Sequence, residues 1–510
     1  MAPDNAGLAV TRARPDLLAS AQGVECWDVL VIGGGATGLG AAVDAASRGY
    51  STLLLEAHDF AKGTSSRSTK LIHGGVRYLA QGRVGLVREA LVERARLLAN
   101  APALVQPLRF VVPVYSRWSQ LKMRVGLAAY DLLAGRYGLG RVRGMSVAET
   151  RAALPNVRAE GLRGGVEYFD AQFDDAGLAI ALAQTVIAQG GTALNYAAVT
   201  GLTLSEGRVA GVCARDAISG QDLMFKARTV INAAGVWVDD IRRMAEPDAP
   251  PMLAPSQGVH LVVDADWLPG DGAMLVPETS DGRVLFLIPW QGKVLLGTTD
   301  TPRQDSPLEP RALETEIDFI LRTAADYLVR APGRGDVRSV FAGLRPLIAA
   351  DPDAPRSELS REHVIRVSPQ GLVTIAGGKW TTYRQMAEEV VDEVLKAADL
   401  PPRTCRTQAL ALHSAWPEAG EALHPRLDLS EARVRHAVRT QFALTVEDVL
   451  ARRHRALFLD AAAAIAIVPE VARIMADELD RDAAWIAAQV EAFIVTAEGY
   501  RCTPATPPGA

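Results

Sequence analysis

The stretch Asp28–Glu56, DVLVIGGGATGLGAAVDAASRGYSTLLLE, decides the fold of this 510-residue chain. Its apolar run Val29–Ile32 predicts a buried strand, which is followed by a glycine-rich turn and by an apolar pattern with helical spacing. A second apolar run, Thr52–Leu55, ends on Glu56. The order strand, turn, helix, strand predicts a unit that binds a dinucleotide.

The turn between the first strand and the helix has the pattern G-x-G-x-x-G. Gly33 permits the tight turn, Gly35 lets the backbone approach a pyrophosphate, and Gly38 lets helix and strand pack closely. Ala36 and Thr37 open the helix, whose unpaired N–H groups and positive dipole end attract an anion.

Glu56 stands at the end of the second strand, where a ribose diol would lie. An acidic residue at this position is typical of dinucleotide sites, and it strengthens a glycine pattern that is weak evidence alone. These residues do not distinguish NAD from FAD.

Composition excludes several classes of protein. A net charge of −5 gives no reason to expect a nucleic-acid partner. The four cysteines are far apart, which indicates a reducing compartment and no bound metal. No apolar run is long enough for a membrane-spanning helix. Residues 1–25 lack the apolar core of a signal peptide and are expected to be a disordered extension.

A loop dense in hydroxyls, glycines and charge follows Glu56, with the sequence SSRSTKLIHGGVRYL at 65–79. A solvated loop with a helix cap would explain its serines, but it explains His73 and Arg77 less well. We expect the loop to contact pyrophosphate, ribitol and flavin edge. Its predicted cofactor contacts are Thr64, Ser65, Ser68, Lys70, Leu71 and His73.

Two later turns have similar chemistry. The stretch INAAGVWVDDI at 231–241 places Ala234 and Gly235 at the end of a strand, where backbone can touch a cofactor. The stretch GLVTIAGGKWTTYR at 371–384 places Gly378 and Lys379 before a helix that begins near Thr381 or Thr382. That helix start is a second predicted anion site. The complete set of predicted cofactor contacts adds Val199, Ala234, Gly235, Gly378, Lys379 and Thr381 to the loop residues and to Gly33, Gly35, Ala36, Thr37, Gly38 and Glu56.

Two further segments allow more than one interpretation. Residues 107–135 combine Trp118 and basic side chains with apolar ones, which suits either a membrane interface or a surface helix packed on its domain. Residues 166–182 pass from a strand through Asp174 and Asp175 into a helix. One of these two carboxylates is expected to cap the helix, and the pair is not expected to act as an acid/base pair.

The remaining elements are predicted from periodicity. Helices are expected at 84–99, 312–331, 431–440, 446–456 and 484–498, and strands at 192–204, 208–213, 223–231, within 258–300 and at 339–344.

Six features follow one another along the chain: the opening unit Asp28–Glu56, SSRSTKLIHGGVRYL, INAAGVWVDDI, IPWQGKVLLGTTD, GLRPL and IAGGKWTTYR. In this order, they closely resemble the FAD-dependent glycerol-3-phosphate dehydrogenases. These are members of the D-amino-acid oxidase-like flavoproteins. The resemblance covers about residues 26–400. It implies FAD, oxidation of sn-glycerol 3-phosphate to dihydroxyacetone phosphate by hydride transfer to flavin N5, electron transfer to a membrane quinone, and peripheral attachment to the inner, cytoplasmic face of the cell membrane.

The resulting fold class is α/β, with a Rossmann-like FAD-binding domain, an inserted antiparallel-sheet substrate domain and a C-terminal all-helical domain. The predicted FAD-binding domain comprises 26–100, 160–245 and 340–400, and the predicted substrate and membrane-proximal domain comprises 101–159 and 246–339. Residues 401–510 form the predicted helical domain. A homodimer is compatible with these features.

A phosphate substrate requires fixed cations, and Arg77, Arg345 and Lys379 each stand beside a predicted cofactor turn. The resemblance places Arg345 and Lys379 near substrate and flavin. His73 and His260 both lie in family-like motifs, and either imidazole could take the hydroxyl proton. We favour His73, because its loop should lie against the flavin; Arg345 could instead polarise the hydroxyl.

Three other functions remain open at this stage. A glycerol-3-phosphate oxidase would pass electrons to oxygen and release hydrogen peroxide, and no residue type separates it from the dehydrogenase. An amine or amino-acid oxidase should bind its carboxylate with one arginine, so Lys379 disfavours it. A flavin-binding regulatory protein without turnover would not require His73, Arg77, Arg345 and Lys379 together.

Overall fold

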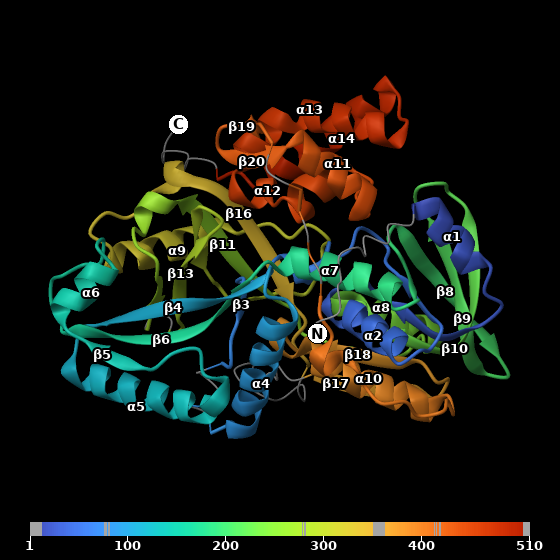
Figure 1. The fold of residues 1–510 in the computed structure, drawn as a ribbon, viewed down its shortest axis with the longest axis horizontal. Coiled ribbons are helices and arrows are strands. Elements are labelled where there is room, and N and C mark those ends of the chain that lie inside the picture. Colours follow the sequence, from blue (N-terminus) through green and yellow to red (C-terminus); the bar gives the residue numbers. More distant parts are fainter. Residues whose placement is uncertain are drawn as a thin grey trace, which may run out of the picture.

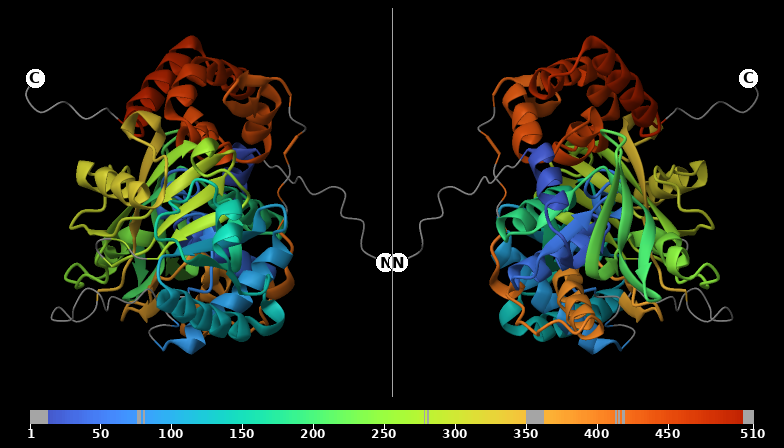
Figure 2. Two further views of the ribbon diagram at one scale, coloured as in Figure 1. Left: turned by 90° about the vertical axis from the view of Figure 1, so that its left-hand side faces the viewer. Right: turned by 90° about the vertical axis from the view of Figure 1, so that its right-hand side faces the viewer.

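Two large sheets and a C-terminal helical layer make up the chain (Figure 1). The computed structural model describes residues 13–75, 79, 82–277, 279, 282–349, 363–412, 414, 416–417 and 420–502. Figure 2 shows the helical layer across the top of the molecule from both sides.

The first sheet is built around Asp28–Glu56. Its order is β17-β18-β10-β1-β2-β7, and β8 and β9 extend β10 as an antiparallel meander. β18, β10, β1, β2 and β7 are parallel. The strands are β1 (Trp27–Ile32), β2 (Thr52–Leu55), β7 (Thr192–Leu194), β8 (Ala197–Ser205), β9 (Arg208–Asp216), β10 (Asp222–Asn232), β17 (His363–Val367) and β18 (Val373–Gly377).

Helices cover the first sheet because its strands are apolar on both sides. α2 (Ala36–Ser47) packs against α7 (Asp175–Ala188) and α10 (Tyr383–Ala397), and their apolar side chains form one core with β1. α8 (Val238–Ala245) follows β10. The carboxyl ends of the parallel strands therefore share one edge, where the glycine turn lies.

The prediction that residues 1–25 form a disordered extension is wrong in part. Residues Arg14–Gln22 form α1, which buries Leu17 and Ala21 in a core shared with β1 and β10. Arg14 anchors this helix through a 2.6 Å ion pair with Asp216. Residues 1–12 lie outside the described part.

The second sheet is mostly antiparallel, in the order β15-β11-β14-β13-β12-β4-β6-β3, with β16 beside β11 and β5 beside β6. The parallel pair β12–β4 joins its two halves. The strands are β3 (Leu71–Ile72), β4 (Val105–Val114), β5 (Arg143–Met145), β6 (Gly164–Phe173), β11 (Ser256–Asp264), β12 (Ala273–Val276), β13 (Leu285–Trp290), β14 (Lys293–Gly297), β15 (Thr301–Pro302) and β16 (Val337–Arg345).

Sheet membership differs from the predicted domain boundaries. β3, β6 and β16 pair within the second sheet, although all or most of each falls in a segment expected for the FAD-binding domain. β6 pairs with β4 over ten residues, from Val105 opposite Phe173 to Val114 opposite Gly164. Alternation along a strand predicts its buried face but not its partner, so the sequence did not indicate this pairing.

Helices surround the second sheet, and short 3-10 turns join the elements. The helices are α4 (Val84–Asn100), α5 (Arg117–Ala134), α6 (Val147–Ala153) and α9 (Glu314–Tyr327). The 3-10 turns are η1 (Thr64–Ser66), η2 (Gly135–Tyr137), η3 (Gly235–Trp237), η4 (Ala265–Trp267), η5 (Arg334–Asp336), η7 (Trp380–Thr382) and η8 (Thr407–Ala409).

The C-terminal layer shares its core with the second sheet. Phe458 packs against Phe341 of β16 and against Tyr500, and the Ser339 hydroxyl donates to Leu457 O at 2.8 Å. Its elements are the hairpin β19 (Ala422–His424) and β20 (Leu427–Ser430), α11 (Glu431–Thr440), the π-helical turn η9 (Asp448–Arg453), α12 (Ala456–Leu459), α13 (Ala461–Leu479) and α14 (Ala483–Glu498). The hairpin is an exception to the predicted all-helical content.

Candidate functional site: a dinucleotide cavity

A cavity of about 570 Å³ lies where the two sheets meet. Its wall includes strand β11 and the carboxyl ends of five further strands: β1, β2, β10, β16 and β18. The residues predicted from sequence that line it are Gly33, Gly35, Ala36, Thr37, Glu56, Thr64, Ser65, Ser68, Leu71, His73, Val199, Ala234, Gly235, His260, Arg345, Gly378, Lys379 and Thr381. Gly38 and Lys70 do not line the cavity, and Arg77 lies outside the described residues.

The glycine turn has the shape that a pyrophosphate requires. Gly33 has a φ of +110°, and a Cβ there would lie 2.5 Å from the carbonyl oxygen of Ala233. A Cβ on Gly38 would lie 1.9 Å from the carbonyl oxygen of Gly33. Gly38 therefore acts by letting α2 pack on the turn, which explains its position behind the cavity wall.

Glu56 is fixed at one side of the cavity by backbone donors. Gly34 N donates to one carboxylate oxygen at 2.6 Å, and His58 N donates to the other at 2.9 Å. Burial raises the pKa of Glu56, and these two N–H groups partly oppose the rise. The carboxylate is thus held at the strand end where an adenosine ribose is expected.

The segment 64–69 joins three parts of the site that are distant in sequence. The Ser65 hydroxyl accepts from Ala36 N at 2.9 Å, and the Trp380 indole N–H donates to Ser65 O at 2.9 Å. The Thr64 hydroxyl donates to Leu344 O at 2.6 Å. The first turn of α2, the turn before α10 and the end of β16 therefore surround one cavity.

Lys70 does not line the cavity, although it is predicted as a cofactor contact. Its ammonium is fully buried and donates to Asp175 at 2.6 Å and to Ser66 O at 2.8 Å. Burial lowers the pKa of Lys70 to about 7, although Asp175 opposes this effect. Asp174 is the helix cap, because its side chain accepts from Gly177 N at 3.0 Å. The adjacent Asp175 instead binds this lysine, which capping patterns could not indicate.

His73 and Thr381 meet at the cavity. His73 N donates to the Thr381 hydroxyl at 3.3 Å, and that hydroxyl lies 3.4 Å from His73 O. The histidine loop and the Gly378–Lys379 turn are thus in contact across 308 residues. Gly377 and Gly378 have φ of +81° and +79°, so the second turn also needs glycine.

His260 is buried on β11 between polar and aromatic neighbours. Its Nε2 lies 3.0 Å from the Thr69 hydroxyl, and its ring stacks on Phe341 with centroids 4.9 Å apart. Burial, followed by Lys70 and Arg345, lowers the pKa of His260 well below its ordinary value. The imidazole is therefore neutral near pH 7.

Arg345 ends β16 with its guanidinium held in one orientation. It donates to Asp300 at 3.0 Å, to Thr299 O at 2.8 Å and to the Thr298 hydroxyl at 3.1 Å. Lys379 precedes η7, where unpaired N–H groups add positive potential. These groups give the wall near the histidines a cationic character.

Two cavity cations were missed from sequence. Lys62 and Arg67 line the cavity, and both pair with Glu309, at 2.9 Å and 2.7 Å. Their partner is more than 240 residues away, so sequence spacing carried no signal for the pairing. The part of the chain that the structure describes contains no cluster of His, Cys, Asp or Glu suited to a metal ion.

The site fits FAD. The cavity offers two glycine turns at strand ends, and each precedes a helix N-terminus. The family model described as FAD dependent oxidoreductase matches residues 28–384. The model for the C-terminal domain of alpha-glycerophosphate oxidase matches residues 377–485.

Known proteins are similar to this chain over nearly its whole length. A probable mitochondrial glycerol-3-phosphate dehydrogenase from Caenorhabditis elegans is 39% identical, over 94% of this chain and 74% of the relative. The crystal structure of a glycerol-3-phosphate dehydrogenase from Bacillus halodurans, complexed with FAD, is 29% identical with a TM-score of 0.78, over 97% of this chain and 98% of that one.

A more distant structure shares the fold. The L-alpha-glycerophosphate oxidase from Mycoplasma pneumoniae, with FAD bound, is 18% identical with a TM-score of 0.59, over 77% of this chain and all of that one. At this identity the likeness concerns architecture alone. Together with the cavity and the closer relatives, these findings establish that the chain belongs to the FAD-dependent oxidoreductases, in their glycerol-3-phosphate dehydrogenase family, and that FAD is its cofactor.

Proposed function

We propose that the protein oxidises sn-glycerol 3-phosphate to dihydroxyacetone phosphate. One observation carries this proposal: the cavity that holds the dinucleotide turn is also lined by His73, His260 and the cations Arg345 and Lys379. Bound FAD supplies a hydride acceptor, flavin N5, for oxidation of a secondary alcohol. The residues of the chain must bind the phosphate, orient the alcohol and accept its proton.

Arg345 and Lys379 are the proposed phosphate ligands. The Arg345 fork is already oriented by Asp300 and by the carbonyl of Thr299, so little side-chain entropy is lost when the substrate binds. Lys379 adds a point charge at the start of a helical turn. A phosphomonoester brings close to two negative charges, which favours a site that offers both a guanidinium and an ammonium group. Arg77, which is also predicted to bind the substrate, lies outside the residues that the structure describes.

His73 is the proposed proton acceptor. Its loop lines the cavity and contacts Thr381 at the second glycine turn. His260 is the alternative, and its low pKa keeps the imidazole in the form that can accept a proton. The Nε2 of His260 lies within hydrogen-bond distance of the Thr69 hydroxyl, whereas its buried Nδ1 has no hydrogen-bond partner among the residues that the structure describes. Because His260 is only 2% exposed, we retain His73 for direct proton transfer.

A membrane quinone is the proposed electron acceptor. α5 exposes Trp118 at 72%, Leu121 at 51%, Val125 at 63% and Leu132 at 83%, on one side of the helix. Its opposite side buries Leu127 and Tyr130. Such an apolar stripe suits a helix lying in a membrane interface. None of the described helices is long and apolar enough to cross a bilayer.

These features support peripheral attachment to the inner face of the cell membrane, with quinone reached from the lipid. A homodimer is also compatible with this function.

The second candidate function is that of an oxidase of the same substrate, because the C-terminal family model takes its name from an alpha-glycerophosphate oxidase.

Substrate and acceptor can be tested separately. The purified protein is supplied with a soluble quinone and, in turn, with glycerol 3-phosphate, glycerol, glycine and D-alanine. Quinone reduction by glycerol 3-phosphate alone supports the proposed substrate, whereas turnover of an amino acid contradicts it. In air without quinone, stoichiometric peroxide at the same rate would identify the oxidase, and slow peroxide release would support the quinone.

A further inference from the structure

The segment 59–67 has one side in the cofactor cavity and another side against the C-terminal layer. Its residues Ala61, Lys62, Gly63, Thr64, Ser65 and Arg67 line the cavity. On the other side, it contacts residues 447–455, Glu309 and Tyr500. The C-terminal layer therefore touches the segment that lines the cofactor cavity.

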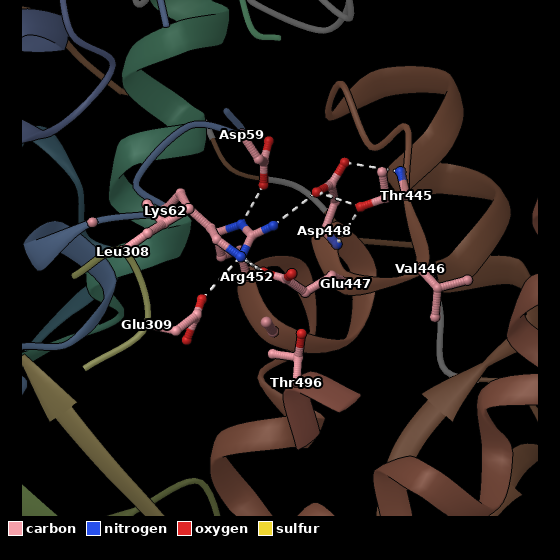
Figure 3. A network of polar contacts seen from close by, with 12 residues as sticks. Asp59, Lys62, Leu308, Glu309, Thr445, Val446, Glu447, Asp448, Arg452 and Thr496 are labelled. Carbon is pink, nitrogen blue, oxygen red and sulfur yellow. Dashed lines mark hydrogen bonds and ion pairs between the residues drawn. The ribbon is translucent and has the colours of Figure 1, made fainter. Parts of the chain in front are cut away.

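Asp59 is the first anchor of the segment. It is fully buried and binds two consecutive arginines of η9, Arg452 and Arg453. Figure 3 shows Arg452 between Asp59, Glu447 and Asp448. The second nitrogen of Arg453 donates to Asp59 Oδ1 at 2.9 Å. Arg452 also binds Glu447 at 2.6 Å and Asp448 at 2.7 Å. The arginines are thus fixed from both sides.

Lys62 and Arg67 form the second anchor. Lys62 pairs with Glu447 from the C-terminal layer and, at 2.9 Å, with Glu309. Arg67 pairs with Glu309 at 2.7 Å and donates to the Tyr500 hydroxyl at 3.2 Å. Both cations belong to the cavity wall, so their positions depend on residues from two other parts of the chain.

Arg455 is the third anchor. Its guanidinium is fully buried, donates to Ser66 O at 2.6 Å and lies over Phe458. The residue has a φ of +71°, in the left-handed region that large side chains rarely adopt. It lies two residues after the end of η9, a π-helical turn of a type that is rare and concentrated at functional sites. This irregular backbone directs three arginines at one segment.

Charge balance makes the contact sensitive to single changes. The network contains four carboxylates and four cations, namely Asp59, Glu309, Glu447, Asp448, Lys62, Arg67, Arg452 and Arg453. Removing one member leaves an uncompensated charge in a buried site. The segment would then relax, and its cavity side would move with it.

From these contacts, we propose that Glu447, Arg452, Arg453 and Arg455 are positioning residues for FAD. Docking of the C-terminal layer holds the segment 59–67 in the shape that retains the cofactor. Retention of FAD and attachment of this layer are therefore coupled, and each strengthens the other. The proposal concerns cofactor binding and does not depend on the identity of the substrate.

The test uses holoenzyme carrying Glu447→Gln or Arg453→Lys. Gln keeps the shape of Glu447 but removes its charge, and Lys keeps the charge of Arg453 but not its fork. The control is Glu478→Gln, because Glu478 pairs with Arg435 and Arg439 of α11 in the same layer. FAD release is followed by flavin fluorescence after dilution, and melting temperature is measured with and without excess FAD.

We expect both variants to release FAD at least about tenfold faster than wild type, as a loss near 1.4 kcal/mol would produce. The increase in melting temperature on adding FAD should shrink, while Glu478→Gln behaves like wild type. If one variant fails to fold, the other decides the matter. Wild-type release rates in the folded variants, with an unchanged FAD-induced shift, would overturn the proposal and leave the network a purely structural role.

Discussion

The Tyr130 hydroxyl on α5 accepts a hydrogen bond from Gly74 N at 2.8 Å and lies 3.0 Å from a carboxylate oxygen of Asp170. Tyr130 thus joins the helix with the exposed apolar stripe to the loop that carries His73. Burial raises the pKa of Asp170 to about 6, against the opposing effect of Arg94.

Tyr130→Phe should slow substrate oxidation without releasing FAD. Gly74 N and Asp170 would lose a partner in a buried site, which costs about 1–3 kcal/mol and would let the His73 loop shift. We expect the rate of flavin reduction to fall about tenfold. Stopped-flow absorbance measures this rate. Tyr137→Phe is the control, since its hydroxyl contacts the exposed Arg136; equal effects of the two changes would exclude a specific role for Tyr130.

Arg345→Lys should weaken substrate binding. Lysine cannot reproduce the oriented fork beside Asp300, and loss of about 2–3 kcal/mol predicts a rise in KM for glycerol 3-phosphate of about 30- to 150-fold. Arg338→Lys is the control, because Arg338 lies on the same strand and pairs with Asp264 at 2.6 Å. Steady-state kinetics with a soluble quinone distinguish the two. An unchanged KM in Arg345→Lys would contradict the proposed phosphate ligand.

Glu447 should contribute to stability in a pH-dependent way. Burial alone would raise the pKa of Glu447, but Arg452 and Lys62 outweigh burial and hold this pKa at about 2, below its usual 4.5. A lowered carboxyl pKa adds stability above pH 4.5 that is lost as pH falls through 2. The difference between the usual pKa and the pKa in the folded protein corresponds to about 3 kcal/mol of folding stability at neutral pH. Urea unfolding should therefore show a gap between wild type and Glu447→Gln that is largest at pH 7 and narrows below pH 5. A gap independent of pH would contradict this origin of the stability.

The double change Trp118→Ser and Leu132→Ser should reduce binding to lipid. Each side chain could bury apolar area worth about 1.5–3 kcal/mol in an interface, so the pair predicts a loss of at least about tenfold in vesicle affinity. Cosedimentation with vesicles of phosphatidylcholine and phosphatidylglycerol measures it. The control is Met224→Ser with Val495→Ser, two apolar side chains elsewhere that are 67% and 66% exposed. Equal binding by both double variants would exclude α5 as the lipid contact.

Local patterns predicted much of the fold. The glycine turn, the adjacent strands and α4 required only residue spacing, and the structure confirms them at 27–56 and 84–100. α11 coincides with its predicted range, and Asp174 is the one of the two predicted candidates, Asp174 and Asp175, that caps α7. In each case, the deciding contacts lie within a few residues along the chain.

Predictions failed where a long-range partner decides the outcome. Lys70 resembled its polar neighbours in sequence, but its ammonium turns away from the cavity toward Asp175, 105 residues later. α1 is stabilised by a core and by Asp216 rather than by its own pattern. No local pattern indicates the role of Asp59, because its arginine partners lie more than 390 residues later in the chain.

The central claim is most directly tested by anaerobic titration of the purified flavoprotein with glycerol 3-phosphate. The flavin absorbance near 450 nm should bleach fully with glycerol 3-phosphate, and adding a soluble quinone should restore it. Glycine or D-alanine should leave the spectrum unchanged. Bleaching by an amino acid and none by glycerol 3-phosphate would contradict the proposed function.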